Sequence, residues 1–166
     1  IGWKQLVQGK EGETRIISIS YKWLGENKIY DLEWTANQSD KEIMEKFLPI
    51  YNTSDMVIGF NNKSFDDKLV NTRAMKYGLD VNIHIKSFDI MKQCNKVFRL
   101  PSKSMAYIAQ FRGLGGKLEH TGIQMWEDIQ YGTPEEAKAA MKLMIKYNRQ
   151  DVALTELIYL DLRKYF

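Results

Sequence analysis

The feature that most restricts the fold is a pair of strand patterns joined by a short turn. In RIISISYKW, residues 15–23, every second residue from Ile17 onward is apolar, which is the period of a half-buried strand. KIYDLEW, residues 28–34, alternates in the same way from Tyr30 onward, and LGEN lies between the two runs. Two such runs joined by a short glycine-containing loop predict an antiparallel hairpin.

The remaining patterns alternate between helix and strand. A mixed order of this kind, after an antiparallel hairpin, predicts an α/β domain with a mixed sheet and flanking helices. Gly78 is the expected stop of one helix, because glycine favours the left-handed cap. The expected elements are a short helix beginning near 37–40, an interior strand at 55–60, a helix at 63–78, a strand and then a helix within 81–94, a short segment at 104–113, a loop at 113–122 and a helical block at 134–163.

Composition narrows the class of protein. The chain has 166 residues, about one domain, with 44% hydrophobic and 27% charged residues, as in a soluble globular protein. We therefore expect a single domain over 1–166. The single cysteine, Cys94, cannot form an internal disulfide, which favours a reducing, cytoplasmic setting. The sequence contains no apolar run long enough to span a membrane and no signal-peptide pattern, so no membrane partner is expected.

Positive charge is concentrated in one segment. Residues 1–54 carry seven Lys or Arg against eight acids, and residues 118–166 carry six against eight. Residues 86–117 carry seven against one, Asp89. Such a segment indicates either a surface that meets polyanions or a solvated lysine-rich face. Its basic residues are Lys86, Lys92, Lys96, Arg99, Lys103, Arg112 and Lys117.

Two acidic positions are candidates for chemistry. Asp66 comes just after the strand pattern at 55–60, in GFNNKSFDD, where open α/β sheets bind ligands. The alternative is an ordinary acid at a helix N-terminus, favoured by the helix dipole. Tyr147 and Asp151, in YNRQDV, stand four residues apart in a helical pattern and therefore share one face. They form either an ordinary partly exposed pair or part of a reactive site.

Together these motifs resemble a known family. The pattern Asn-x3-Phe-Asp after a hydrophobic strand, from Asn61 to Asp66, followed by Tyr-x3-Asp on a helix, resembles the DEDD superfamily of 3′–5′ exonucleases, tyrosine subgroup. DMVIGFNNKSFDDKLVNTRAMKYGL is similar to the second motif of family B polymerase proofreading domains, and still more to that of predicted phage and bacterial exonucleases. The resemblance covers about residues 15–166. It implies a ribonuclease H-like fold.

The resemblance also implies an activity. Hydrolysis of phosphodiester bonds at 3′ ends of DNA, with RNA left open, would use two Mg²⁺ or Mn²⁺ ions. Asp66 and Asp151 would bind metal, and Tyr147 would orient the attacking water. Phe65 is either a core residue or a base-stacking wedge, and Phe98, Tyr107 and Phe111 are open to the same two interpretations. The substrate-binding residues implied are Asn61, Phe65, Lys103, Lys117 and His120.

Two of the four acids of the family pattern have no clear match. The pattern places Asp-x-Glu on the first strand of the sheet, whereas Asp31-Leu32-Glu33 lies on the second strand of the hairpin. Its acids are expected to point away from the apolar face toward the wetter side. We therefore expect the first strand, with its Asp-x-Glu, to lie upstream of Ile1. The alternative function is a nuclease-like fold without catalysis, serving as a nucleic-acid-binding or scaffolding module.

Overall fold

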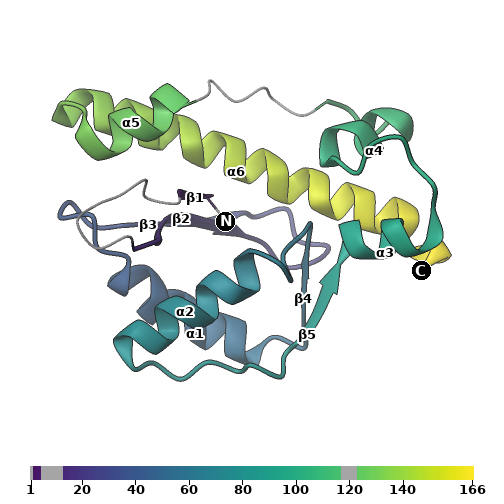
Figure 1. Cartoon of the computed structure of the whole chain (residues 1–166), viewed down its shortest axis with the longest axis horizontal. Coiled ribbons are helices and arrows are strands. Elements are labelled where there is room, and N and C mark those ends of the chain that lie inside the picture. The colour runs from purple at the N-terminus through teal and green to yellow at the C-terminus, as the bar shows by residue number, and fades with distance from the viewer. Residues whose placement is uncertain (1, 5–12, 117–122) are drawn as a thin grey trace. The chain divides into compact units, whose positions relative to one another are not determined.

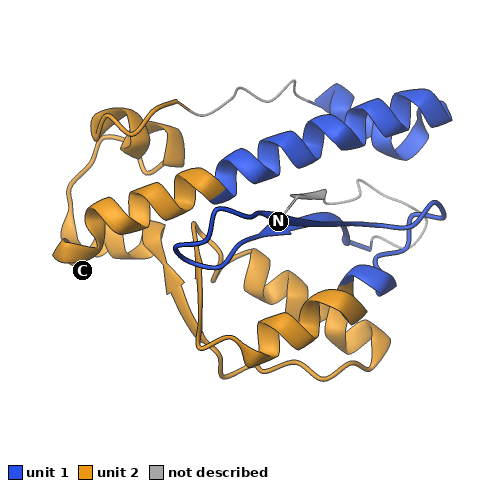
Figure 2. Cartoon of the chain, turned by 180° about the vertical axis from the view of Figure 1, so that it is seen from behind, with its two compact units in different colours: residues 1–43, 118–152 blue, residues 44–117, 153–166 orange. Residues whose placement is uncertain are grey.

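The computed structural model describes residues 2–4, 13–116 and 123–166 (Figure 1). The chain forms two compact units, each made of two separate stretches of sequence (Figure 2). Unit 1 comprises Ile1–Ile43 and Leu118–Val152, and unit 2 comprises Met44–Lys117 and Ala153–Phe166. Two helices continue from one unit into the other: α1 (Lys41–Thr53) and α6 (Pro134–Leu162).

Unit 1 contains an antiparallel sheet of β1 (Gly2–Lys4), β2 (Arg15–Tyr21) and β3 (Tyr30–Glu33), in the order β1-β2-β3. The predicted hairpin is confirmed as β2 and β3, although both strands are shorter than their patterns. Tyr21 pairs with Tyr30 beside the turn, and their rings stack with centroids 5.2 Å apart.

Strand β2 is buried on both faces, so the prediction of a half-buried strand is wrong. All five residues from Ile16 to Ser20 are buried. The face opposite Ile17 is covered by α6, because the Asn148 side-chain amide donates a 2.7 Å hydrogen bond to Ser18 Oγ. Serines alternate with isoleucines in this strand, which resembles the pattern of a solvated face; here the polar face is covered by a polar partner.

The helices of unit 1 are α5 (Ile123–Tyr131) and the first part of α6. Helix α5 was not expected from the sequence, where only the block at 134–163 is strongly periodic. A capping box starts α6: Thr133 N–H donates to Glu136 Oε2 over 2.8 Å, and Glu136 N–H donates to Thr133 Oγ1 over 3.3 Å. The reciprocal bonds satisfy two backbone donors that the helix leaves unpaired.

Unit 2 contains a parallel strand pair, β4 (Met56–Gly59) and β5 (Lys86–Asp89). Among the described residues, parallel and antiparallel pairing are therefore both present, each in a small sheet of its own. Strand β4 is also more exposed than an interior strand, since in the described residues it pairs along one edge, with β5. The helices α2 (Asp66–Tyr77), α3 (Ile90–Val97) and α4 (Met105–Phe111) complete the element order here. Helix α2 ends at Gly78 with φ 63°, as predicted.

One apolar core of unit 2 is formed by α3, α4 and the last part of α6. A final 3-10 turn, Arg163–Tyr165, follows α6 in the chain. Phe60 and Phe88 pack against this core from the ends of β4 and β5. Burial raises the pKa of the Cys94 thiol, which lies within it. None of the helices in the described stretches is both long and apolar enough to cross a bilayer. The buried residues of the apolar core are Ile90, Cys94, Ile108, Ala109, Leu154, Ile158 and Leu162.

Candidate active site

The segment after β4 is held by one buried carboxylate. Asp89, at the end of β5, is only 1% exposed. Its oxygens accept hydrogen bonds from the backbone N–H groups of Asn61 (3.0 Å), Lys63 (3.2 Å) and Lys92 (3.2 Å). Asn61 adopts a left-handed conformation with φ 61°, which asparagine tolerates better than most residues. Asp89 thus caps α3 and fixes the turn that leads to Asp66.

A second polar cluster lies beside this turn. Asp67 Oδ2 accepts a 2.5 Å hydrogen bond from Ser87 Oγ, and the Asn62 amide donates to Ser87 Oγ over 2.7 Å and to Asp67 over 3.3 Å. Asn62 folds back so closely that a Cβ at Gly59 would lie 2.6 Å from the Asn62 Cβ. Glycine at position 59 is therefore required by close approach of the side chain, since its φ is not positive.

Asp66 is the first residue of α2 and is half-buried. Burial is the main cause that raises its pKa, and the carboxylates of Asp67 and Asp89 act in the same direction. A helix N-terminus alone would lower the pKa of an acid, so the environment of Asp66 is not that of an ordinary capping acid. A carboxyl group whose pKa is raised by burial, and further by neighbouring carboxyl groups, is a candidate functional group.

Tyr147 and Asp151 lie on α6, one turn apart, as the sequence predicted. Tyr147 is 6% exposed, and Asp151 is half-buried. The bond between Asn148 and Ser18 fixes the rotation of this turn of α6 relative to β2. Both candidates therefore sit on a helical turn whose orientation within unit 1 is set by a specific contact.

Asp31 makes structural contacts. It accepts a 2.7 Å hydrogen bond from Ser20 Oγ and forms an ion pair with Arg149 Nε at 3.4 Å. Glu33 is exposed, as expected, and Asp31 on the same face of β3 is half-buried, because α6 supplies Arg149 on that side. These contacts agree with the interpretation that this motif is not the missing metal-binding pair.

The predicted substrate-binding residues divide into three groups. Asn61 and Phe65 precede α2, and Phe65 is 48% exposed, so the core interpretation of Phe65 is wrong. Lys103 is exposed ahead of α4. Lys117 and His120 lie outside the described residues.

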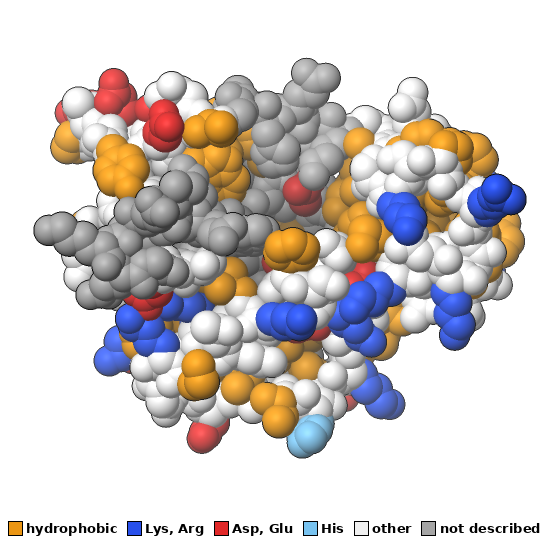
Figure 3. All heavy atoms as spheres, viewed as in Figure 1, with side chains coloured by type: hydrophobic (Ala, Val, Ile, Leu, Met, Phe, Trp, Pro, Cys, Tyr) orange, Lys and Arg blue, Asp and Glu red, His pale blue; other side chains and the backbone are white. Residues whose placement is uncertain are grey.

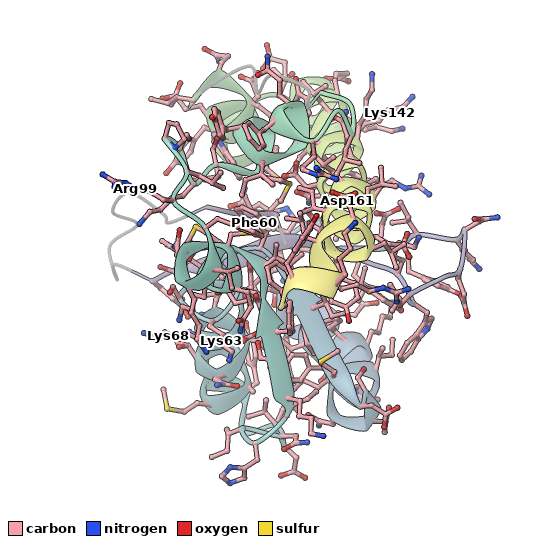
Figure 4. All side chains as sticks on the ribbon, turned by 90° about the vertical axis from the view of Figure 1, so that its right-hand side faces the viewer. Phe60, Lys63, Lys68, Arg99, Lys142 and Asp161 are labelled. Atoms are coloured by element: carbon pink, nitrogen blue, oxygen red, sulfur yellow. The ribbon has the colours of Figure 1, made fainter. Side chains whose placement is uncertain are left out.

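Basic side chains of unit 2 gather on the side that also carries the start of α2. Figure 4 shows Lys63, Lys68 and Arg99 on the same side of this unit. In Figure 3, lysine and arginine side chains are spread over the part of that face formed by unit 2. Lys63 and Lys68 are absent from the sequence-based expectation, although they flank Asp66 within NNKSFDDKL. Their nearness to Asp66 in the sequence could have identified them as candidate substrate-binding residues.

The described residues do not by themselves form a metal centre. Across residues 13–116 and 123–166, no three His, Cys, Asp or Glu side chains are grouped so that they could hold an ion. Asp67 and Asp89, the two carboxylates whose charges help to raise the pKa of Asp66, are occupied by hydroxyl, amide and backbone donors. Asp66 is suited to contribute one hard oxygen ligand, but the other ligands of a divalent cation are not assembled around it within unit 2.

The parallel pair β4-β5, the acidic start of α2 and the Tyr-x3-Asp turn of α6 define an α/β protein with the elements of a nuclease fold. The family model of the RNase H superfamily matches residues 8–163. The chain therefore belongs to the RNase H superfamily. Its fold is ribonuclease H-like, as predicted, and membership indicates a nuclease-type hydrolase that binds nucleic acid. No curated protein matches the chain.

Proposed function

We propose that this protein is a metal-dependent 3′–5′ exonuclease of the tyrosine subgroup of the DEDD superfamily. Its substrate is DNA, with RNA as the second choice, and it cleaves phosphodiester bonds from the 3′ end. The observation that carries the proposal is the presence, in one RNase H superfamily chain, of Asp66 at the start of α2 and of Tyr147 and Asp151 on one face of α6.

Each residue has a role in this proposal. Asp66 and Asp151 would hold Mg²⁺ or Mn²⁺, which when bound supplies a nucleophilic hydroxide and stabilises the leaving oxygen. Tyr147 holds the attacking water through its hydroxyl group, a role that suits a phenol fixed by burial on a helix. Asn61 and Phe65 contact the terminal nucleotide, and Lys103 binds the phosphate backbone, with Lys117 and His120 as further phosphate contacts.

The basic side of unit 2 supports the choice of a polyanionic substrate. Lys63 and Lys68 flank Asp66 in the sequence, and both are exposed. Positive charge near the cleavage site attracts the end of a nucleic-acid strand, and added salt weakens this attraction. We therefore expect binding to fall steeply as salt is raised.

The test uses a 5′-labelled single-stranded oligonucleotide with Mn²⁺ or Mg²⁺, incubated with the wild-type protein and with its variants. A ladder that shortens from the 3′ end supports the proposal. Asp151→Asn should lower the rate by about 100-fold or more, and Tyr147→Phe by about 10- to 100-fold. Glu135→Gln, an exposed acid in the first turn of the same helix, serves as the control and should cleave normally.

A second candidate function has one observation in its favour. Because the described residues group no three metal-ligating side chains, a nuclease-like fold that binds nucleic acid without cleaving it is the alternative. Binding without any cleavage by the wild-type protein, with either metal, would reject the exonuclease and leave this binding module.

A further inference from the structure

The exposed aromatic pair on α4, Tyr107 and Phe111, is used by neither the core nor the candidate active site. Its rings are 6.0 Å apart between centroids and nearly parallel, with an interplanar angle of 21°. Phe111 is 65% exposed and Tyr107 is half-buried. A stacked pair this open to solvent exposes apolar surface that a core interpretation does not explain.

Helix α4 holds this pair rigidly. Ser104 Oγ accepts a 3.1 Å hydrogen bond from the Tyr107 N–H and caps the helix start. At the other end Arg112 donates to both carboxylate oxygens of Asp161, over 2.6 and 3.1 Å. Ile108 and Ala109 are buried in the core of unit 2. Rings fixed on an anchored helix lose little conformational freedom when a flat ligand stacks on them.

The charge around the pair indicates the kind of ligand. Residues 90–117 contain no acid, and Lys96, Arg99 and Lys103 are exposed in the segment that leads into α4. Arg112 is committed to Asp161, so the charge available to a ligand comes from the residues before the helix. Flat, exposed rings on a helix that follows an acid-free segment with exposed basic side chains complement a polymer with both flat bases and phosphates.

We propose that Tyr107 and Phe111 form a base-stacking platform for single-stranded nucleic acid, with Lys103 and Arg99 binding the adjoining phosphates. Unpaired bases are required, because bases within a duplex already stack on each other. The inference rests on the proposed function in one respect: the proposed function identifies nucleic acid as the polymer that is bound. It is tested by binding without metal, so the platform and the exonuclease can each fail alone.

The test measures the affinity of the full chain for a short single-stranded DNA oligonucleotide in EDTA, by fluorescence anisotropy. Phe111→Ala should weaken binding by roughly 5- to 100-fold, the usual range for the loss of one base-stacking ring. Phe111→Trp should retain the affinity, and Phe111→Leu, which keeps apolar bulk without the ring, should lose it. Tyr131→Ala is the matched control, because Tyr131 is 71% exposed but lies on α5 among the acids of that helix.

An abasic oligonucleotide of the same length separates stacking from charge. It keeps every phosphate and lacks the bases, so Phe111→Ala should leave its affinity unchanged. Lys103→Gln should weaken both oligonucleotides and reduce the salt dependence of log K by about 0.7, the value for one phosphate contact on a single strand. Equal affinity of Phe111→Ala and wild-type protein for the normal oligonucleotide would overturn the platform. So would equal losses on normal and abasic strands, or a preference for duplex.

Discussion

The two segments that carry the candidate catalytic residues are held in place by different means. In unit 2, the turn before Asp66 is held by a buried carboxylate, Asp89, that accepts three backbone N–H groups. In unit 1, the α6 turn that carries Tyr147 is oriented by a buried neutral hydrogen bond between Asn148 and Ser18, and at its exposed edge by the ion pair of Arg149 with Asp31.

The difference follows from how each backbone satisfies its hydrogen bonds. An α-helix interior pairs its own N–H and C=O groups, so only its rotation against the sheet remains to be fixed. The turn after β4 cannot do so, because Asn61 has a left-handed conformation and nearby N–H groups lack regular partners. A carboxylate can accept several such donors at once. We therefore expect the unit 2 segment to be the more sensitive of the two to a single substitution.

The largest effect is expected for Asp89→Ala. It would leave the backbone donors of Asn61, Lys63 and Lys92 without their acceptor in a buried place, and we expect a loss of about 3 kcal/mol or more in the free energy of unfolding. Urea denaturation measures it. Asp80→Ala is the control, because the Asp80 side chain is exposed and should change stability little. Equal effects of the two changes would contradict the role of Asp89.

A smaller effect is expected for Gly59→Ala. The added Cβ would lie 2.6 Å from the Asn62 Cβ, so Asn62 must move away from Ser87 and Asp67. We expect a loss of about 2 kcal/mol, typical of added bulk at a tightly packed position. Gly116→Ala should be nearly neutral, since a Cβ there meets nothing within 4 Å. Thermal unfolding of both variants provides the comparison.

In unit 1, Ser18→Ala should cost about 1–2 kcal/mol, because the buried Asn148 amide loses its acceptor. A double-mutant cycle with Asn148→Ala should show coupling between the two positions. Ser20→Ala is the comparison, since its partner Asp31 is only half-buried and also pairs with Arg149. If the cycle shows no coupling, this hydrogen bond does not orient α6.

The smallest effect is expected for Tyr51, a buried residue of α1 whose pKa is affected by the charge of Asp67. Burial, and to a lesser extent the charge of Asp67, raises the pKa of Tyr51 to about 12. The neutral phenol is thus favoured in the folded state. Its stabilising contribution is fully present below the ordinary pKa of 10.0 and is lost as the pH rises toward 12.

The wild-type protein should therefore lose about 1 kcal/mol more stability than Tyr51→Phe between neutral pH and about pH 11. Denaturant titrations of both proteins across this range measure the difference. Parallel curves would show that Tyr51 ionises as readily in the folded state as in the unfolded chain.

Local patterns in the sequence predicted the elements that depend on local chemistry. The hairpin of β2 and β3 follows from alternation, the end of α2 follows from Gly78, and the shared face of Tyr147 and Asp151 follows from helical spacing. Helix α5 was not predicted, because a run of nine residues is too short for its apolar spacing to give a strong helical signal. The two interpretations of Phe111, core or base stacking, stay open at the level of sequence, because aromatic composition does not reveal which face of a short helix is exposed.

The sequence by itself determined the kinds of element, their order and the motifs that resemble a nuclease, since these depend on neighbours along the chain. Only the tertiary structure decided which polar residues meet. Asp89 lies 28 positions from Asn61, and Ser18 lies 130 positions from Asn148. The alternation in β2 predicts a half-buried strand, whereas Ser18 and Ser20 are buried, because periodicity records polarity and not the partner that covers it. The partner is chosen by packing between distant segments, where a buried polar group must find a hydrogen bond.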